Sequence, residues 1–183
     1  MEENIRNTHR AGGKKPRVLW LMQYAPHYRE RLLRLMGERL DLTITAVPCS
    51  EYSLIDPHER TGYRYVEKQG IRLGEFWFLN EFPQVCLSKR WDAIICTEDL
   101  HHPVRYLLYL LWHLSGRRCS ARWIWWGHFH GRRSAKLLRL IRRVLVNSSS
   151  GALTYTEPLR DALISMGVPP SKVRSSNNAE TSH

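Results

Sequence analysis

Short apolar runs alternate with amphipathic segments along most of this chain, and this alternation is the strongest constraint on its fold. The runs "RVLWLM", "DLTITAV", "WDAIICT", "RWIWW" and "ALTYT" have the length and residue types of buried strands. Helical patterns cover residues 27–40, 103–116, 132–146 and 158–166. Strands and helices that alternate in this way are typical of a parallel sheet with helices on both faces. The sequence therefore predicts an α/β fold of Rossmann-like type.

The remaining segments give weaker patterns. "YRYVEKQ" alternates weakly and predicts a third strand, and "KVRSSNN" predicts the last one. Residues 82–89 indicate a short helix, whereas residues 73–79 fit neither pattern better than the other. Residues 1–16 are polar and aperiodic, so we expect a flexible basic tail before one domain over residues 17–175.

The charge balance favours an anionic partner. The chain of 183 residues has 28 Lys and Arg against 17 Asp and Glu, a net charge of +11. Nucleic acid, an anionic membrane face and a phosphorylated substrate all fit this charge, but no helix-turn-helix, zinc or RNP pattern supports nucleic acid.

The four cysteines are scattered without a C-x-x-C pair, and the longest apolar run, residues 106–112, is too short to span a bilayer. We expect a cytoplasmic protein.

Ligands of open parallel sheets bind outside the carboxyl ends of the strands, and this rule selects the candidate site. The residues in these positions are Tyr24, His27, Tyr28 and Arg29 after the first strand, Glu98 and Asp99 after the fourth, Gly127, His128 and His130 after the fifth, and Thr156 after the sixth. The turn after the first strand contains no glycine, so a dinucleotide-binding fingerprint is absent.

Two histidines carry the candidate chemistry. His128 or His130 can orient or deprotonate a sugar hydroxyl, or donate to a developing negative charge, and the flanking glycines allow close approach of a ligand. The alternative is that they cap the next helix or pack against Trp126. Asp99 has a comparable alternative as a helix cap. His101-His102 and His128-x-His130 are candidates for a metal site, but adjacent histidines do not easily share one ion and no His-x3-His pair or Cys partner accompanies them, so we expect no metal. We also expect no cofactor.

The segment "GRRSAKLLRLIRRVLV" predicts a basic amphipathic helix. Its apolar stripe comprises Leu137, Leu138, Ile141, Val144 and Leu145. The basic residues are Arg132, Arg133, Lys136, Arg139, Arg142 and Arg143, with no acid among them. Two interpretations stay open, a helix that rests on anionic lipid headgroups and a surface helix with a solvated polar face.

Taken together, these segments resemble the N-terminal half of a glycosyltransferase of family 4, the retaining enzymes with the GT-B fold. The similar segments are "RVLWLMQYAPHYRERLLRLM", "WDAIICTED", "WIWWGHFHGR" with its W-G-H-G turn, and the closing "ALTYTEPLRDALISMGVPPSKVRSSNNAET". They extend from Arg17 to Thr181. Two positions depart from the family pattern, because Glu180 replaces the usual Asp and the first turn lacks glycine.

The resemblance implies transfer of a sugar, with retention and without an essential metal, from a nucleotide-sugar donor to a glycan or lipid-linked acceptor. His128 matches a histidine that lies near the transferred sugar, and His130 takes a variable position beside it. Residues 17–175 then form the acceptor-side domain and residues 176–183 begin the linker to a donor-binding domain. Without that domain we expect no activity. The alternative is a non-catalytic module that binds an acceptor or the cytoplasmic membrane face.

Overall fold

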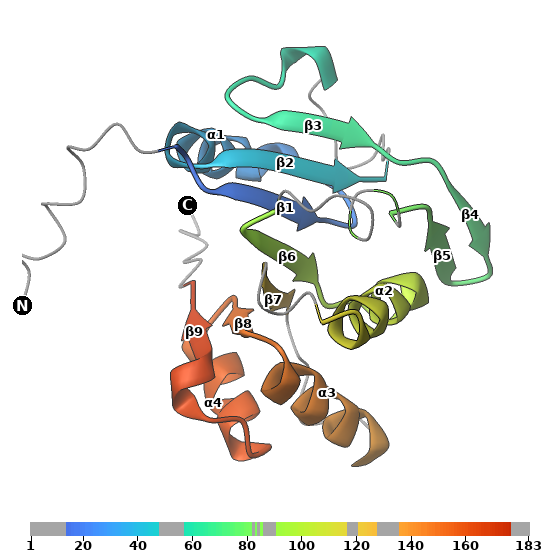
Figure 1. Ribbon diagram of the computed structural model, residues 1–183, viewed down its shortest axis with the longest axis vertical. Coiled ribbons are helices and arrows are strands. Elements are labelled where there is room, and N and C mark those ends of the chain that lie inside the picture. Colours follow the sequence, from blue (N-terminus) through green and yellow to red (C-terminus); the bar gives the residue numbers. More distant parts are fainter. Residues whose placement is uncertain are drawn as a thin grey trace, which may run out of the picture.

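A seven-stranded sheet forms the centre of the computed structural model, which describes residues 14–47, 57–81, 83, 85, 91–116, 121–127 and 136–176 (Figure 1). All neighbouring strands are parallel. Their order is β3-β2-β1-β6-β7-β8-β9. The strands are β1 (Arg17–Leu21), β2 (Asp41–Ala46), β3 (Arg64–Glu67), β6 (Ala93–Thr97), β7 (Arg122–Gly127), β8 (Gly151–Thr154) and β9 (Val173–Ser175).

Helices cover both faces of this sheet. The helix α1 (Glu30–Arg39), entered through the 3₁₀ turn η2 (His27–Arg29), packs Leu33 into the same cluster as Val18 and Trp20. The helices α2 (Pro103–Leu114), α3 (Lys136–Ser148) and α4 (Glu157–Ser165) pack on the other face, where Leu19 and Leu21 point. Two further 3₁₀ turns are η3 (Pro57–Glu59) and η6 (Pro170–Lys172). The expected α/β fold is confirmed.

The segment without a clear pattern is a β-hairpin. Strands β4 (Gly70–Leu73) and β5 (Phe76–Leu79) pair antiparallel, and Gly74 makes the turn with a φ of 60°. The hairpin lies beside α2, and the Trp77 backbone N–H donates to the His101 carbonyl at 2.7 Å (Figure 1). The helix expected over residues 82–89 falls mostly outside the described residues.

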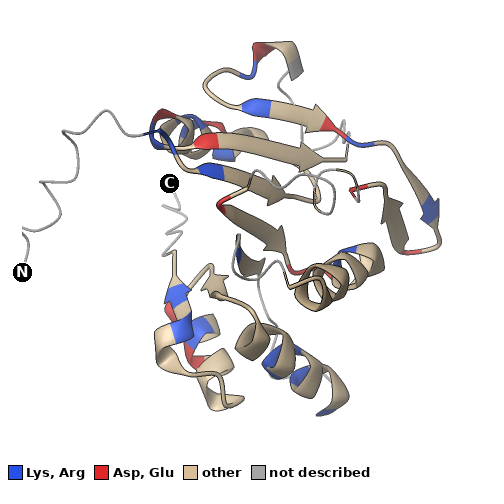
Figure 2. Cartoon of the chain, viewed as in Figure 1, with Lys and Arg blue, Asp and Glu red and all other residues tan. Residues whose placement is uncertain are grey.

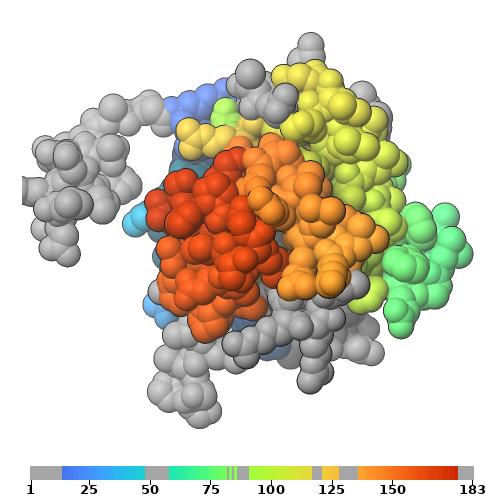
Figure 3. All heavy atoms as spheres, turned by 90° about the horizontal axis from the view of Figure 1, so that it is seen from below, coloured from blue at the N-terminus to red at the C-terminus, as the bar shows by residue number. Residues whose placement is uncertain are grey.

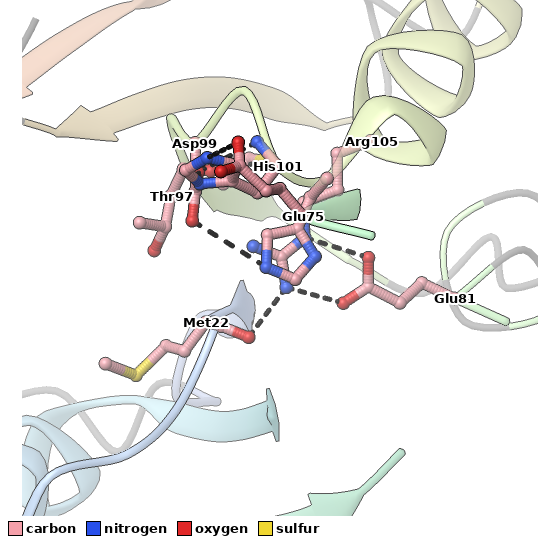
Figure 4. A network of polar contacts seen from close by, with 9 residues as sticks. Met22, Glu75, Glu81, Thr97, Asp99, His101 and Arg105 are labelled. Atoms are coloured by element: carbon pink, nitrogen blue, oxygen red, sulfur yellow. Dashed lines mark hydrogen bonds and ion pairs between the residues drawn. The ribbon is translucent and has the colours of Figure 1, made fainter. Parts of the chain in front are cut away.

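A fully buried ion pair joins α2 to the segment after β5. Arg105 of α2 donates from Nε and Nη2 to the Glu81 carboxylate at 3.0 and 2.9 Å, and Nη2 also donates to the Met22 carbonyl at 2.6 Å (Figure 4). Both side chains are only 1% exposed. Burial lowers the pKa of Arg105, but the Glu81 charge more than offsets this and raises it. The guanidinium of Arg105 therefore connects α2 to the segment after β1 and to the segment after β5.

His102 lies directly before α2 and is also buried, at 1% exposure. Neither ring nitrogen has a hydrogen-bond partner among the described residues, and the nearest carboxylate oxygen is Asp99 Oδ2 at 3.7 Å from Nε2. Burial, with the nearby Arg105 charge, lowers the pKa of His102 to about 3. This imidazole is neutral in the folded protein at physiological pH.

We expect Arg105→Met to lower the free energy of unfolding by about 3–5 kcal/mol, because the Glu81 carboxylate stays buried without its cation. Urea unfolding at neutral pH measures the change. Arg160→Met is the matched control, since the exposed pair of Arg160 with Glu157 should contribute at most about 1 kcal/mol. The double variant Arg105→Met/Glu81→Met should recover most of the loss. A cost for Arg105→Met no larger than that for Arg160→Met would contradict this account.

We expect His102 to make the protein less stable in acid. The unfolded state binds a proton below about pH 6.5, whereas folded His102 resists protonation until about pH 3, so stability falls as pH falls through this window. The contribution to the slope is at most about 1.4 kcal/mol per pH unit. Urea unfolding at several pH values should give a shallower slope for His102→Leu and His102→Gln than for the unchanged protein. Identical slopes would show that His102 is not the group responsible.

Candidate functional site

A cleft opens at the carboxyl end of the sheet, where the strand order changes direction. From β1 the chain turns toward α1 and β2, and from the neighbouring β6 it turns the other way, toward α2 and β7. Loops that diverge in this way leave a crevice between them, which is the usual ligand site of such sheets. Here the crevice has a volume of about 350 Å³ and is lined by residues of the 22–29 and 97–101 loops, together with Arg142 and Tyr155.

Arg29 lies on one wall of the cleft among three aromatic rings. Its guanidinium carbon is 5.1 Å from the Tyr155 ring centroid, 5.6 Å from that of Tyr28 and 5.9 Å from that of Trp126. The Trp126 ring in turn stacks on Trp20 of the core, with centroids 4.3 Å apart. These contacts hold the Arg29 side chain by cation–π attraction. Its N–H groups can therefore serve an anionic ligand.

Glu98 lies on the opposite loop and is held by an arginine from α3. Arg142 Nε donates to Glu98 Oε1 at 2.9 Å, and both side chains are under 9% exposed. The Glu98 backbone N–H donates to the Trp126 carbonyl at 2.6 Å. Gly127 lies close beside this loop, because a Cβ at this position would be 2.9 Å from the Glu98 Cβ. The glycine at the end of β7 thus gives room to the Glu98 loop.

Asp99 organises the turn that leads to α2. Its Oδ1 accepts the His101 backbone N–H at 2.9 Å and lies 3.0 Å from His101 Nδ1. His102 lies directly before α2, and its backbone N–H donates to the Asp99 carbonyl at 3.1 Å. Asp99 therefore stabilises the loop before the helix and also lines the cleft.

The structure brings some of the residues expected at the site together in the cleft. Tyr24, Tyr28, Arg29, Glu98 and Asp99 line the cleft. Three others lie next to it without lining it: exposed His27, which contacts Tyr28 edge-on, Gly127, and Thr156, which precedes α4. His128, His130, Arg132 and Arg133 lie outside the described residues.

The basic face expected on α3 is divided. Lys136, Arg139 and Arg143 are exposed, whereas Arg142 is buried against Glu98 and does not belong to that face. The apolar stripe is divided as well: Leu137, Ile141 and Val144 are exposed, whereas Leu138 and Leu145 are half-buried. The reason is that α3 turns the side with Arg142 and Val146 toward the sheet.

Arg142 and Tyr155 line the cleft from outside its two main loops, and sequence reasoning placed neither of them there. A signal for Arg142 is present, since it stands four residues after Leu138 and four before Val146, so it shares their side of the helix. Tyr155 directly follows β8, where a parallel strand delivers side chains to the ligand edge.

In the described ranges, no group of three His, Cys, Asp or Glu side chains is placed to hold a metal ion. Within the same ranges, no helix combines the length and the apolar content needed to cross a bilayer.

Comparison with known proteins shows a likeness of fold. No protein-family model and no curated protein matches the sequence. Among solved structures, HepE (Alr3699) of Anabaena in complex with UDP and glucose is similar over 87% of this chain and 43% of its own, with a TM-score of 0.55 and 11% identity. The same protein has been solved with UDP-glucose.

A second similar structure is the UDP-N-acetylglucosamine 2-epimerase of Rickettsia bellii. It matches over 88% of this chain and 44% of its own, with a TM-score of 0.56 and 13% identity. The chain thus spans less than half the length of each of these proteins. The fold is therefore that of one Rossmann-like half of GT-B-type structures.

Proposed function

We propose that this chain is the acceptor-side domain of a glycosyltransferase similar to family 4. The cleft at the change of strand order is the observation that carries the proposal, because it unites a cation, aromatic faces and carboxylates at the ligand edge of the sheet. The acceptor is a saccharide or a lipid-linked sugar, and its phosphate, where present, binds Arg29. The donor is a nucleotide sugar.

The residue types in the cleft suit a phosphorylated sugar. Carboxylates such as Glu98 and Asp99 accept hydrogen bonds from hydroxyl groups, and the nearby Arg142 charge keeps Glu98 in place for this role. The rings of Tyr28 and Tyr155 offer apolar faces to a sugar ring. The Arg29 guanidinium offers paired N–H donors to phosphate oxygens.

His128 is the proposed catalytic residue on this domain. It directly follows Gly127 in the sequence, and Gly127 ends β7 beside Glu98 at the ligand edge of the sheet. Its imidazole would orient a hydroxyl of the transferred sugar or stabilise negative charge that develops there. His130 would have a smaller part.

A donor-binding domain, on the same polypeptide or on another, would complete the enzyme. The similar structures that hold UDP or UDP-glucose are more than twice as long as the part this chain matches. The resemblance to family 4 implies that this second domain would hold most of the nucleotide. A non-catalytic acceptor-binding module is the competing interpretation, and measurements of turnover separate the two.

We expect Arg29→Met to weaken binding of a phosphorylated sugar by about 10–100-fold, because a charge-assisted hydrogen bond contributes about 1.5–3 kcal/mol. Calorimetric titration of the chain with glucose 1-phosphate and with glucose measures the effect, which should be confined to the phosphorylated ligand. Arg39→Met, an exposed arginine on α1, is the matched control. Equal affinity of Arg29→Met and the unchanged protein would remove Arg29 from the site.

In an enzyme completed by a donor-binding domain, we expect His128→Ala to lower turnover about 10²–10⁴-fold and more strongly than His130→Ala, since a positioned acid or base contributes this much. The assay follows transfer from a radiolabelled nucleotide sugar. The chain alone sets the baseline, for which we expect no transfer. Robust turnover by the chain alone, or full activity of both variants, would contradict the assignment.

A further inference from the structure

The helix α2 exposes an apolar stripe on the side turned away from the sheet. Leu107, Leu110, Leu111 and Leu114 are 54%, 49%, 39% and 71% exposed. Their spacing of three and four residues places them on one side of the helix. The helix already buries Leu108, Tyr109 and Trp112 against the sheet. The outward leucines are therefore not needed for the core.

The neighbouring helix α3 repeats this arrangement. Leu137, Leu140, Ile141 and Val144 have the same spacing and are 65%, 56%, 39% and 56% exposed. The two helices lie side by side on one face of the sheet, joined by a 2.7 Å hydrogen bond between the Tyr109 and Ser148 hydroxyls (Figure 3). We call the two outward stripes together the α2–α3 face. Exposed apolar patches of this kind mark interaction surfaces.

The charges around the α2–α3 face are positive. Basic residues lie along α3 (Figure 2), where Lys136, Arg139 and Arg143 are exposed. These three residues line an open groove of about 850 Å³ between α3 and α4, and Asp161 is the one acid among the described residues that line it. The sequence from Leu100 to Thr156, which contains both helices, has no Asp or Glu at all. Apart from Arg105 and Arg142, which are buried and paired with Glu81 and Glu98, its Lys and Arg residues are Arg117, Arg118, Arg122, Arg132, Arg133, Lys136, Arg139 and Arg143.

The positive charge around the α2–α3 face favours an anionic binding partner over a second copy of the chain. A second copy would bring the same cations against one another, which opposes self-association. An anionic bilayer supplies both an apolar layer for the leucines and phosphates for the flanking cations. Apolar helical faces flanked by Lys and Arg are the pattern of proteins that lie in the membrane interface.

We propose that the α2–α3 face is a docking surface for anionic membranes. The leucine stripes enter the boundary between headgroups and acyl chains, and Lys136, Arg139 and Arg143 contact lipid phosphates. Docking does not require sugar transfer, so this inference goes beyond the proposed function and stands or falls independently of it.

Flotation of the purified chain tests the proposal with vesicles of phosphatidylcholine alone and mixed with phosphatidylglycerol. We expect binding to the mixed vesicles that weakens as salt is raised. Lys136→Glu/Arg139→Glu/Arg143→Glu should lower the partition coefficient more than about 100-fold, and Leu110→Gln/Leu114→Gln more than about tenfold. Arg31→Glu/Arg39→Glu/Arg64→Glu and Leu35→Gln are matched controls at exposed positions elsewhere and should bind as the unchanged chain does.

Hydrogen exchange of the unchanged chain gives a second readout that does not depend on any variant. Mixed vesicles should slow exchange over residues 107–114 and 137–144 and leave α1 unaffected. Failure to bind the mixed vesicles, or equal binding by all variants, would overturn the proposal. So would a dimer in light scattering that Leu110→Gln/Leu114→Gln converts to a monomer, because a second copy would then be the occupant.

Discussion

The buried pair of Arg105 with Glu81 joins the segments that follow β1, β5 and β6. Arg105 belongs to α2, which follows β6, while its other contacts are the Met22 carbonyl after β1 and the carboxylate after β5. An ion pair with this little exposure contributes only if every charged group keeps its partner. The pair therefore ties the loop after β1 to the start of α2, which follows β6. These segments border the cleft, so its shape depends on two side chains that do not themselves line it.

A second buried pair, Arg142 with Glu98, connects the cleft to α3. The helix thus has two sides with different roles: its inner side holds a cleft carboxylate, and its outer side carries part of the α2–α3 face. A membrane that held the outer side would lie about one helix diameter, about 10 Å, from the cleft wall. This proximity would suit an acceptor attached to a lipid, which links the two proposals without making either depend on the other.

Much of the fold could be predicted because strands buried on both faces of a parallel sheet consist of consecutive apolar residues, such as Val18 to Leu21 and Ile94 to Cys96. The β4–β5 hairpin could not, because β5 is a continuous apolar run although its Phe76 and Phe78 are exposed, so the sequence does not show which side faces the protein. At the site, the topological rule located the cleft and Arg29. The rule did not locate Arg142. Its charge suggested the solvent-exposed side of α3, although its spacing from Val146 places it on the side that faces the sheet. Pairing with Glu98 is a tertiary contact, 44 residues apart, that spacing alone does not reveal.

The central claim is that the cleft between the β1 and β6 loops binds a phosphorylated sugar. Nuclear magnetic resonance of the isotope-labelled chain, titrated with glucose 1-phosphate, tests it most directly because every amide reports separately. The account predicts saturable shifts in the 22–29 and 97–101 loops and at Tyr155, the segments that line the cleft. Shifts confined to the basic groove between α3 and α4, lined by Lys136, Arg139 and Arg143, would contradict it.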